Sequence, residues 1–260
     1  MYQLKLGSSI SFADAEYYKK LNEMKSLEFY SVDFDFSNVD AWNMRLEDGL
    51  DAIQKVGLHL NAVHLPFGWH WELCRLDDEE QAEILRKLVA YIKRIDPYKP
   101  DYYILHGSTE PVTPETREER KAQLKKSVGF LRENTDTVLC LEDLPRTCLL
   151  NTAEETIQVV DAIDGVRICA DVNHFLQEKS EDAVLKMGKR IATTHISDHD
   201  YIDEKHWLPK EGKIDWMKLI SSFESVGYNG VFSYEALKYS PEQIRKNYDE
   251  LFAEYNALKK

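Results

Sequence analysis

The chain has few cysteines, and the signatures of several common enzyme classes are absent from it. Its 260 residues include 4 cysteines, and none of them belongs to a C-x-x-C pair. Two of them, Cys140 and Cys169, lie inside apolar segments, so we expect buried thiols rather than disulfides or thiolate ligands. The sequence contains no G-x-x-x-x-G-K-[ST], no G-x-G-x-x-G after its first apolar run and no G-x-S-x-G. These absences argue against a nucleotide phosphate loop, a dinucleotide-binding fold and a serine nucleophile.

Positive charge is also scarce. The 33 Lys and Arg residues are outnumbered by 46 Asp and Glu residues, which gives a formal net charge of −13. An acidic protein repels polyphosphates, because nucleic-acid binding depends on basic surface that displaces counterions. We therefore expect neither a nucleic acid nor a membrane as a partner. Long apolar runs of about eighteen residues are missing, and the N-terminus lacks the segments of a secretion signal, so a cytoplasmic protein is expected.

What the sequence does have is a regular alternation of apolar runs and charged segments. Hydrophobic residues make up 43% of the chain. The apolar runs lie near residues 3–10, 29–36, 60–67, 102–108, 137–144, 166–173, 191–198 and 230–237. Between them, segments such as 77–96 repeat apolar residues at steps of three and four, which is typical of a helix packed on a sheet. Without any linker-like interruption, this order predicts one (β/α)8 TIM barrel domain over residues 1–260, with an open doubly wound sheet as the alternative.

Capping residues mark the ends of several expected helices. Asn151 or Thr152 is expected to cap the helix that follows it, and Ser240 before Pro241 is expected to open the last helix. Because glycine readily takes a left-handed conformation, three glycines are each expected to end a helix just before the next strand: Gly57, Gly165 and Gly227.

Side chains that can bind metal ions stand at the ends of six apolar runs: His64, His106, Glu142, Asp171, His195 and Glu235. Parallel strands of a barrel end on the same face, so we expect these side chains to meet at one rim. The last four would gather three carboxylates and one imidazole, which would repel one another unless a cation joined them. Oxygen-rich ligation with one imidazole suits Mn²⁺, Mg²⁺ or Co²⁺, and Zn²⁺ is a further option.

Four short segments, LEDLP, ADVNHF, THISD and SYEAL, resemble the xylose-isomerase-like barrel superfamily, in particular its sugar (phosphate) isomerases and epimerases and more distantly its apurinic-endonuclease branch. The metal ligands implied by the resemblance are Glu142, Asp171, His195 and Glu235. Residues 206–215 are similar to the family's H-x-x-P-G-x-G-x-I-D loop, but Lys210 replaces the first glycine, which predicts a less tightly turned loop. Glu204 occupies the place of an aspartate of the endonuclease branch, and Asp203 lies one residue further off, which weakens a third metal subsite.

The resemblance implies a metal-dependent isomerase or epimerase that acts on a small sugar or keto-sugar through a metal-stabilised enediolate. Glu142 and Glu235 would take and return the proton, and one divalent ion per chain, Mn²⁺ before the others, would stabilise the developing negative charge. The residues expected to bind the sugar are His64, His106, His174, Asp198 and His206. For Asp198, orienting the ligand His195 is a second option. The expected partner is a small-molecule sugar, and assembly into a homo-oligomer is open.

Two other functions stay open at this point. One is a trinuclear zinc phosphoesterase of the apurinic-endonuclease type, which would use His64, His106, Glu142, Asp171, His174, His195, His206 and Glu235. The acidic net charge and the displaced aspartate speak against it. The other is a non-catalytic barrel that binds a sugar.

The sequence supports two further structural expectations. The aromatic segment PFGWHWEL is expected to wall the pocket or to cover a core edge or a subunit contact. His199, four residues after the ligand His195, is expected at the surface.

Overall fold

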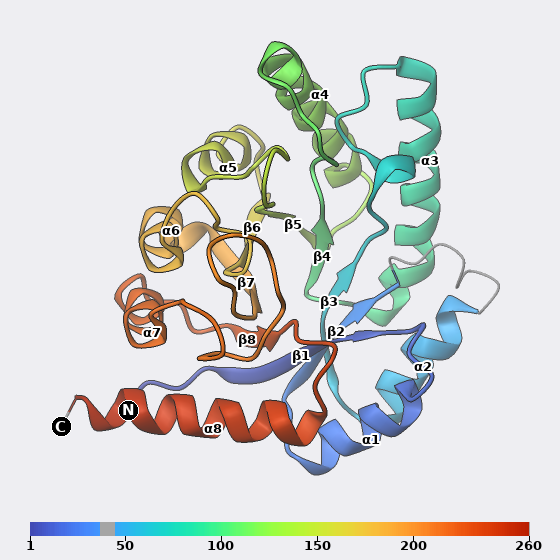
Figure 1. Cartoon of the computed structure of the whole chain (residues 1–260). Helices are drawn as coiled ribbons and strands as arrows, with labels where there is room; N and C mark the ends of the chain where they lie inside the picture. The colour runs from blue at the N-terminus through green and yellow to red at the C-terminus, as the bar shows by residue number, and fades with distance from the viewer. Residues whose placement is uncertain (37–44, 260) are drawn as a thin grey trace.

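The computed structural model describes residues 1–36 and 45–259, and in this part of the chain eight parallel strands close a barrel (Figure 1). The strands are β1 (Lys5–Ser11), β2 (Ser31–Asp35), β3 (His59–His64), β4 (Tyr102–Leu105), β5 (Val138–Glu142), β6 (Arg167–Asp171), β7 (Ile191–Ile196) and β8 (Val231–Tyr234). Each strand pairs with the next along the chain, and β8 pairs with β1. The predicted (β/α)8 barrel is confirmed, and the open sheet is excluded.

Helices alternate with the strands and surround the barrel (Figure 1). Within the described residues they are α1 (Tyr17–Ser26), α2 (Leu46–Val56), α3 (Asp78–Ile95), α4 (Pro114–Arg132), α5 (Ala153–Val160), α6 (Ser180–Met187), α7 (Trp216–Ser225) and α8 (Pro241–Ala257). Short 3-10 turns lie at Trp69–Trp71, Asp96–Tyr98 and Gly188–Arg190. In the part of the chain that the structure describes, the helices are too short or too polar to cross a membrane.

Side chains cap the helices at the predicted positions. At the start of α5, the side chain of Thr152 rather than Asn151 accepts a hydrogen bond from the N–H of Glu155. Ser240 and Gln243 form a reciprocal capping box at the start of α8. Each cap pairs an N–H of the first helical turn that would otherwise lack a partner, which typically contributes about 1 kcal/mol.

The three glycines do not all end helices. Gly57 is left-handed and directly ends α2, and Gly227 is left-handed one residue after the C-cap of α7. Gly165 is left-handed too, with φ 76°, but α5 already ends at Val160. The expectation for Gly165 was wrong because a separate turn lies between α5 and β6, and the glycine shapes that turn.

The apolar core has two parts, one inside the barrel and one between the barrel and its helices. The inner part consists of small and medium side chains that pack on one another: Ala62, Ile104, Cys140 and Cys169. The outer part is much larger and includes residues of every strand and every α-helix. All four cysteines are buried free thiols, as the sequence predicted. This apolar layer gives the polar strand ends a packed base.

The ends of the last four strands bring the predicted ligands to one rim. β5 ends at Glu142 and β6 ends at Asp171, while His195 is the penultimate residue of β7 and Glu235 directly follows β8. Asp171 is the register partner of His195, and His195 is the register partner of Ser233. Strand pairing therefore sets these side chains beside one another at the C-terminal face.

Candidate active site

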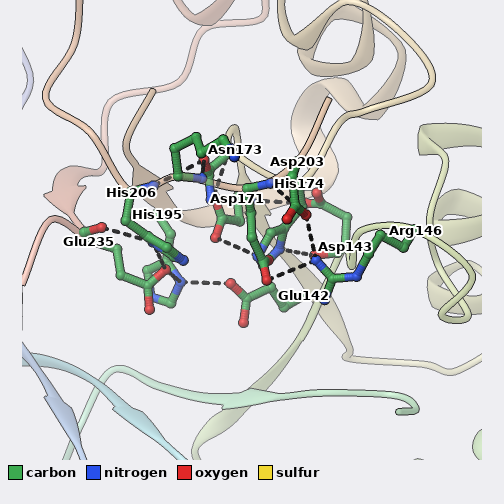
Figure 2. A network of polar contacts seen from close by, with 12 residues as sticks. Glu142, Asp143, Arg146, Asp171, Asn173, His174, His195, Asp203, His206 and Glu235 are labelled. Atoms are coloured by element: carbon green, nitrogen blue, oxygen red, sulfur yellow. Dashed lines mark hydrogen bonds and ion pairs between the residues drawn. The ribbon is translucent and has the colours of Figure 1, made fainter. Parts of the chain in front are cut away.

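Four side chains form a compact cluster at the C-terminal ends of β5 to β8: Glu142, Asp171, His195 and Glu235. Each offers one ligand atom, and these atoms all lie within 4.8 Å of one another. His195 Nδ1 is 2.7 Å from Glu142 Oε1 and 3.5 Å from Glu235 Oε2. Figure 2 shows the four side chains turned toward a common centre. The structure thus brings together the four residues that the sequence resemblance implied as ligands.

The donor set of this cluster fits a divalent cation. Glu142 and His195 are 1% exposed and Asp171 is fully buried, and Asp171 Oδ2 has no hydrogen-bond partner. Three carboxylates gathered in a buried space need compensating positive charge, and the imidazole of His195 supplies at most one unit. Three carboxylates and one imidazole are ligands that Mn²⁺, Mg²⁺ and Zn²⁺ accept.

The three carboxylates of the cluster differ in their pKa values. Burial raises the pKa of Asp171 well above its ordinary value, and the charges of Glu235 and Glu142 act in the same direction. Burial also acts to raise the pKa of Glu142, but the nearby imidazoles, His195 first, outweigh it and hold that pKa well below the usual range. Burial acts to raise the pKa of Glu235 too, but the imidazoles of His195, His206 and His64 together outweigh it and lower that pKa. Glu142 and Glu235 are therefore ionised at neutral pH and can accept a proton or bind a cation.

A cavity of about 560 Å³ opens at this face of the barrel, within the size range typical of small-molecule sites. Glu142 and Glu235 contribute to its lining, whereas Asp171 and His195 do not. Four of the five residues predicted to bind substrate line it: His64, His106, His174 and His206. The cavity thus gives a small molecule access to the two glutamates.

His64 and His106 both contact Glu142 from the opposite side of the cluster. The distances from Glu142 Oε2 are 3.2 Å to His64 Nε2 and 2.9 Å to His106 Nε2. His64 Nδ1 donates to the carbonyl of Leu65 at 2.9 Å, which leaves Nε2 directed at the site. Burial lowers the pKa of His106, while Glu142 outweighs burial at His64 and raises its pKa. These two imidazoles and Glu142 also form a group with metal-binding geometry.

His174 and His206 approach from the loops after β6 and β7, together with Glu204. His174 Nδ1 donates to the Asp143 carbonyl at 2.8 Å, and its Nε2 lies 3.2 Å from Glu204 Oε2. His206 Nδ1 donates to the Glu235 carbonyl at 3.1 Å. The hydrogen bond with His174 is the main cause that lowers the pKa of Glu204 to about 2. His174, Glu204 and His206 make up another group of possible metal ligands.

Arg146 ties the rim loops together, and the sequence analysis did not single it out. Its Nε donates to Glu110 Oε1 at 2.6 Å, and its Nη1 donates to Asp203 Oδ1 and Glu204 Oε1, each at 2.9 Å. Figure 2 shows the guanidinium of Arg146 facing Asp203. Arg146 lines the cavity, but its charge is already shared among carboxylates. A motif search misses it because its partners lie 36 to 58 residues away in sequence.

Asp198 does not line the cavity, so we do not retain it as a substrate-binding residue. Its carboxylate is fully buried and accepts four hydrogen bonds, from the backbone N–H groups of His199, Lys210 and Ile214 and from Nε1 of Trp216. None of these four bonds involves His195, so the second expected role of Asp198 is not retained either. Asp198 instead organises the loop between β7 and α7.

The same loop keeps a tight turn at Lys210. This lysine has φ 78°, a left-handed conformation that glycine adopts at lower cost. Its N–H donates to Asp198 Oδ2 at 2.8 Å. This hydrogen bond to a buried carboxylate helps to hold Lys210 in the left-handed conformation.

The aromatic segment after β3 has three different environments. Phe67 lines the cavity, and its ring centroid is 4.1 Å from that of His106. Trp71 is buried in the core, whereas Trp69 is 53% exposed. His199, expected at the surface, is fully buried and packs its ring 4.4 Å from that of Tyr201. That expectation was wrong because the β7–α7 loop folds back on itself at this residue, where Lys213 N–H donates to the His199 carbonyl at 2.7 Å.

Comparison with known families agrees with this architecture. The pattern of the xylose isomerase-like TIM barrel family matches residues 21–254, and the chain belongs to this family. An inosose isomerase from Bacillus velezensis is 31% identical over 113 residues. That match covers 40% of this chain and 40% of the relative, so the chain spans less than half the length of this curated protein.

Several solved structures share the fold across almost the whole chain. A 3-keto-D-glucoside 4-epimerase from E. coli has a TM-score of 0.76 and 18% identity and covers 96% of this chain and 100% of its own. A D-psicose 3-epimerase from Clostridium cellulolyticum H10, solved with D-tagatose, has a TM-score of 0.76 and 15% identity over 98% and 99%. A protein called IOLI, solved with a bound zinc atom, has a TM-score of 0.76 and 16% identity over 97% and 98%. At these identities the likeness concerns the fold.

Proposed function

We propose that this protein is a divalent-metal-dependent enzyme that isomerises or epimerises a small sugar or keto-sugar. The observation that carries the proposal is the convergence of Glu142, Asp171, His195 and Glu235 beside a cavity of small-molecule size. The family relationship and the names of the relatives, an inosose isomerase and several sugar epimerases, support the same class of reaction.

Two ionised glutamates at the cavity provide the proton transfer. Glu142 and Glu235 both line the cavity and both have lowered pKa values, so either can remove a proton from the carbon beside a carbonyl. Return of a proton to the opposite face of the same carbon gives an epimer, and return to the neighbouring carbon gives an isomer. A bound divalent ion supplies positive charge that lowers the cost of the enediolate's negative charge.

The remaining side chains of the cavity suit the hydroxyl groups of a sugar. His64, His106, His174 and His206 can hold hydroxyls through hydrogen bonds. The charge of the lining favours an unphosphorylated substrate, because Glu110 and Glu204 neutralise Arg146 and the lining carboxylates outnumber Arg146 and Lys238. A phosphate group would meet net negative charge at this rim.

For the metal, we propose one divalent ion held by the four-residue cluster, with Mn²⁺ as the first choice. The zinc in the IOLI structure supports a divalent ion in this fold. The trinuclear zinc phosphoesterase remains the second candidate on a specific observation: two further groups, His64–His106–Glu142 and His174–Glu204–His206, also have metal-binding geometry. Metal analysis of the purified protein separates the two, since one ion per chain favours the isomerase and three zinc ions per chain favour the phosphoesterase.

The reaction itself is tested by proton exchange with solvent. Aldoses, ketoses and inososes, with their phosphates, are incubated with the Mn²⁺-loaded protein in D₂O, and NMR records deuterium uptake at the carbon beside the carbonyl. We expect uptake and a new isomer or epimer with at least one unphosphorylated substrate. Glu235→Gln should abolish both while the fold is kept, and Glu83→Gln on the exposed face of α3 is the matched control. A fully active Glu235→Gln variant would remove this residue from the mechanism.

A further inference from the structure

Beneath the four-residue cluster lies a carboxylate that the proposed reaction does not use. Asp33 is the third residue of β2 and is 1% exposed. Its Oδ1 accepts a hydrogen bond from Asn61 Nδ2 at 2.6 Å, and its Oδ2 accepts one from Ser233 Oγ at 2.5 Å. Asn61 also donates to Thr193 Oγ1 at 3.1 Å. Asp33 is therefore fixed inside the barrel by side chains of β3 and β8, and Thr193 of β7 holds Asn61 in turn.

Asp33 faces the far side of the ligand histidine. His195 Nδ1 is directed toward Glu142 and Glu235, while its other ring nitrogen, Nε2, lies 3.8 Å from Asp33 Oδ2. This buried Nε2 has no hydrogen-bond partner. The separation is an ion-pair distance, longer than an N–H···O hydrogen bond. One imidazole thus lies between the metal-binding cluster on one side and a buried carboxylate on the other.

A histidine that binds a cation through Nδ1 must keep that lone pair free, so the single proton of its neutral ring has to sit on Nε2. We propose that Asp33 is a positioning residue for the metal site, whose carboxylate holds the proton of His195 on Nε2 and so directs Nδ1 to the cation. The proposal rests on the metal site of the proposed function. An acceptor in the barrel interior acts strongly on a proton a few ångströms away, because little water competes for that proton.

Two neighbours could in principle replace Asp33 in this role, and both can be tested. The thiol of Cys169 lies near the His195 ring, since the two offer ligand atoms within 4.8 Å of each other and of Glu142. A thiol is a weak acceptor, however. Ser233 donates to Asp33 Oδ2, but without it the Asp33 carboxylate is still held by the hydrogen bond from Asn61. A variant at either position should therefore retain most of the metal affinity.

The test is calorimetric titration of MnCl₂ into the full-length, metal-stripped protein. We expect Asp33→Asn to weaken Mn²⁺ binding by about 10- to 100-fold, the range found for partners of ligand histidines. Ser233→Ala and Cys169→Ala should weaken it much less than Asp33→Asn does, because both variants keep the Asp33 carboxylate. Equal affinity in Asp33→Asn and the parent would overturn the proposal. The proposal would also be overturned if Ser233→Ala weakened Mn²⁺ binding as much as Asp33→Asn does. Asp33 would then matter only as a hydrogen-bond acceptor that joins the strands of the barrel.

A second measurement needs no variant. In long-range ¹H–¹⁵N spectra of the Zn²⁺-loaded parent, we expect the ring proton of His195 on Nε2, and a proton on Nδ1 instead would overturn the proposal. Failure here is distinguishable from failure of the proposed function. A parent that binds Mn²⁺ and shows the expected loss in Asp33→Asn, but exchanges no substrate proton, supports the positioning role and contradicts the isomerase. A parent that binds no Mn²⁺ overturns both.

Discussion

Gly212 lies where the β7–α7 loop passes over Asp198, and replacing it with alanine tests how this loop is held. A Cβ atom at residue 212 would lie 2.3 Å from Asp198 Oδ1 and 2.3 Å from the carbonyl oxygen of His199. Neither neighbour can move freely, because the His199 carbonyl accepts from Lys213 N–H at 2.7 Å and Asp198 is fully buried. Gly212→Ala must therefore displace the loop or the carboxylate.

The magnitude follows from the bonds that Oδ1 of Asp198 accepts. They come from the N–H groups of His199 at 2.8 Å and Ile214 at 3.2 Å, and hydrogen bonds to a charged group contribute about 1.5–3 kcal/mol each. Partial relaxation of the loop reduces the loss, and we expect Gly212→Ala to lower the free energy of unfolding by about 3 kcal/mol. Turnover should fall as well, because the same loop carries Glu204 and His206.

The assay is urea unfolding followed by circular dichroism, with Gly129→Ala as the matched control. Gly129 lies within α4 and has open space where a Cβ would stand, so this variant should gain about 0.5–1 kcal/mol from the better helix propensity of alanine. If Gly212→Ala unfolds within about 0.5 kcal/mol of the parent, a typical value for uninvolved surface sites, the account of this loop is wrong.

Three further predictions concern the rim and the metal site. Arg146→Met should lower the free energy of unfolding by about 1 kcal/mol, since three partly exposed carboxylates lose their common partner. In the same urea assay, the control Lys246→Met breaks one exposed pair with Glu250 and should leave the free energy of unfolding almost unchanged. Mn²⁺ at 100 times its Kd should add about 2.7 kcal/mol and raise Tm by several degrees, an effect that EDTA reverses in a thermal melt and that an unchanged Tm would contradict. Mn²⁺ affinity should fall as the pH drops through the neutral range, because a proton on His195 competes with the cation. Burial opposes protonation of His195, but Cys169, Glu235 and Glu142 outweigh burial and raise the pKa of His195 well above its ordinary value. Titration calorimetry at several pH values tests this, and an affinity that does not change with pH would contradict it.

Much of the architecture and the four-residue cluster could be predicted from local sequence. The eight apolar runs predicted eight strands, although each strand is shorter than its run, as in β4, which covers only Tyr102–Leu105. Glu142, Asp171, His195 and Glu235 were predictable because each is tied to a strand end, and the ends of parallel strands share one face. Asp198 had the same sequence signal, yet it serves the loop, because four hydrogen-bond donors surround it.

The amino-acid sequence by itself determined the order of strands and helices and the delivery of ligand-type residues to one rim, since hydrophobic periodicity and position in a strand are local properties. Only the tertiary structure decided which residues meet across the barrel. Arg146 joins Glu110 and Glu204, and Asp33 of β2 faces His195 of β7. The physical reason is that these contacts depend on barrel closure and loop conformation, which place side chains within a few ångströms regardless of their separation in sequence.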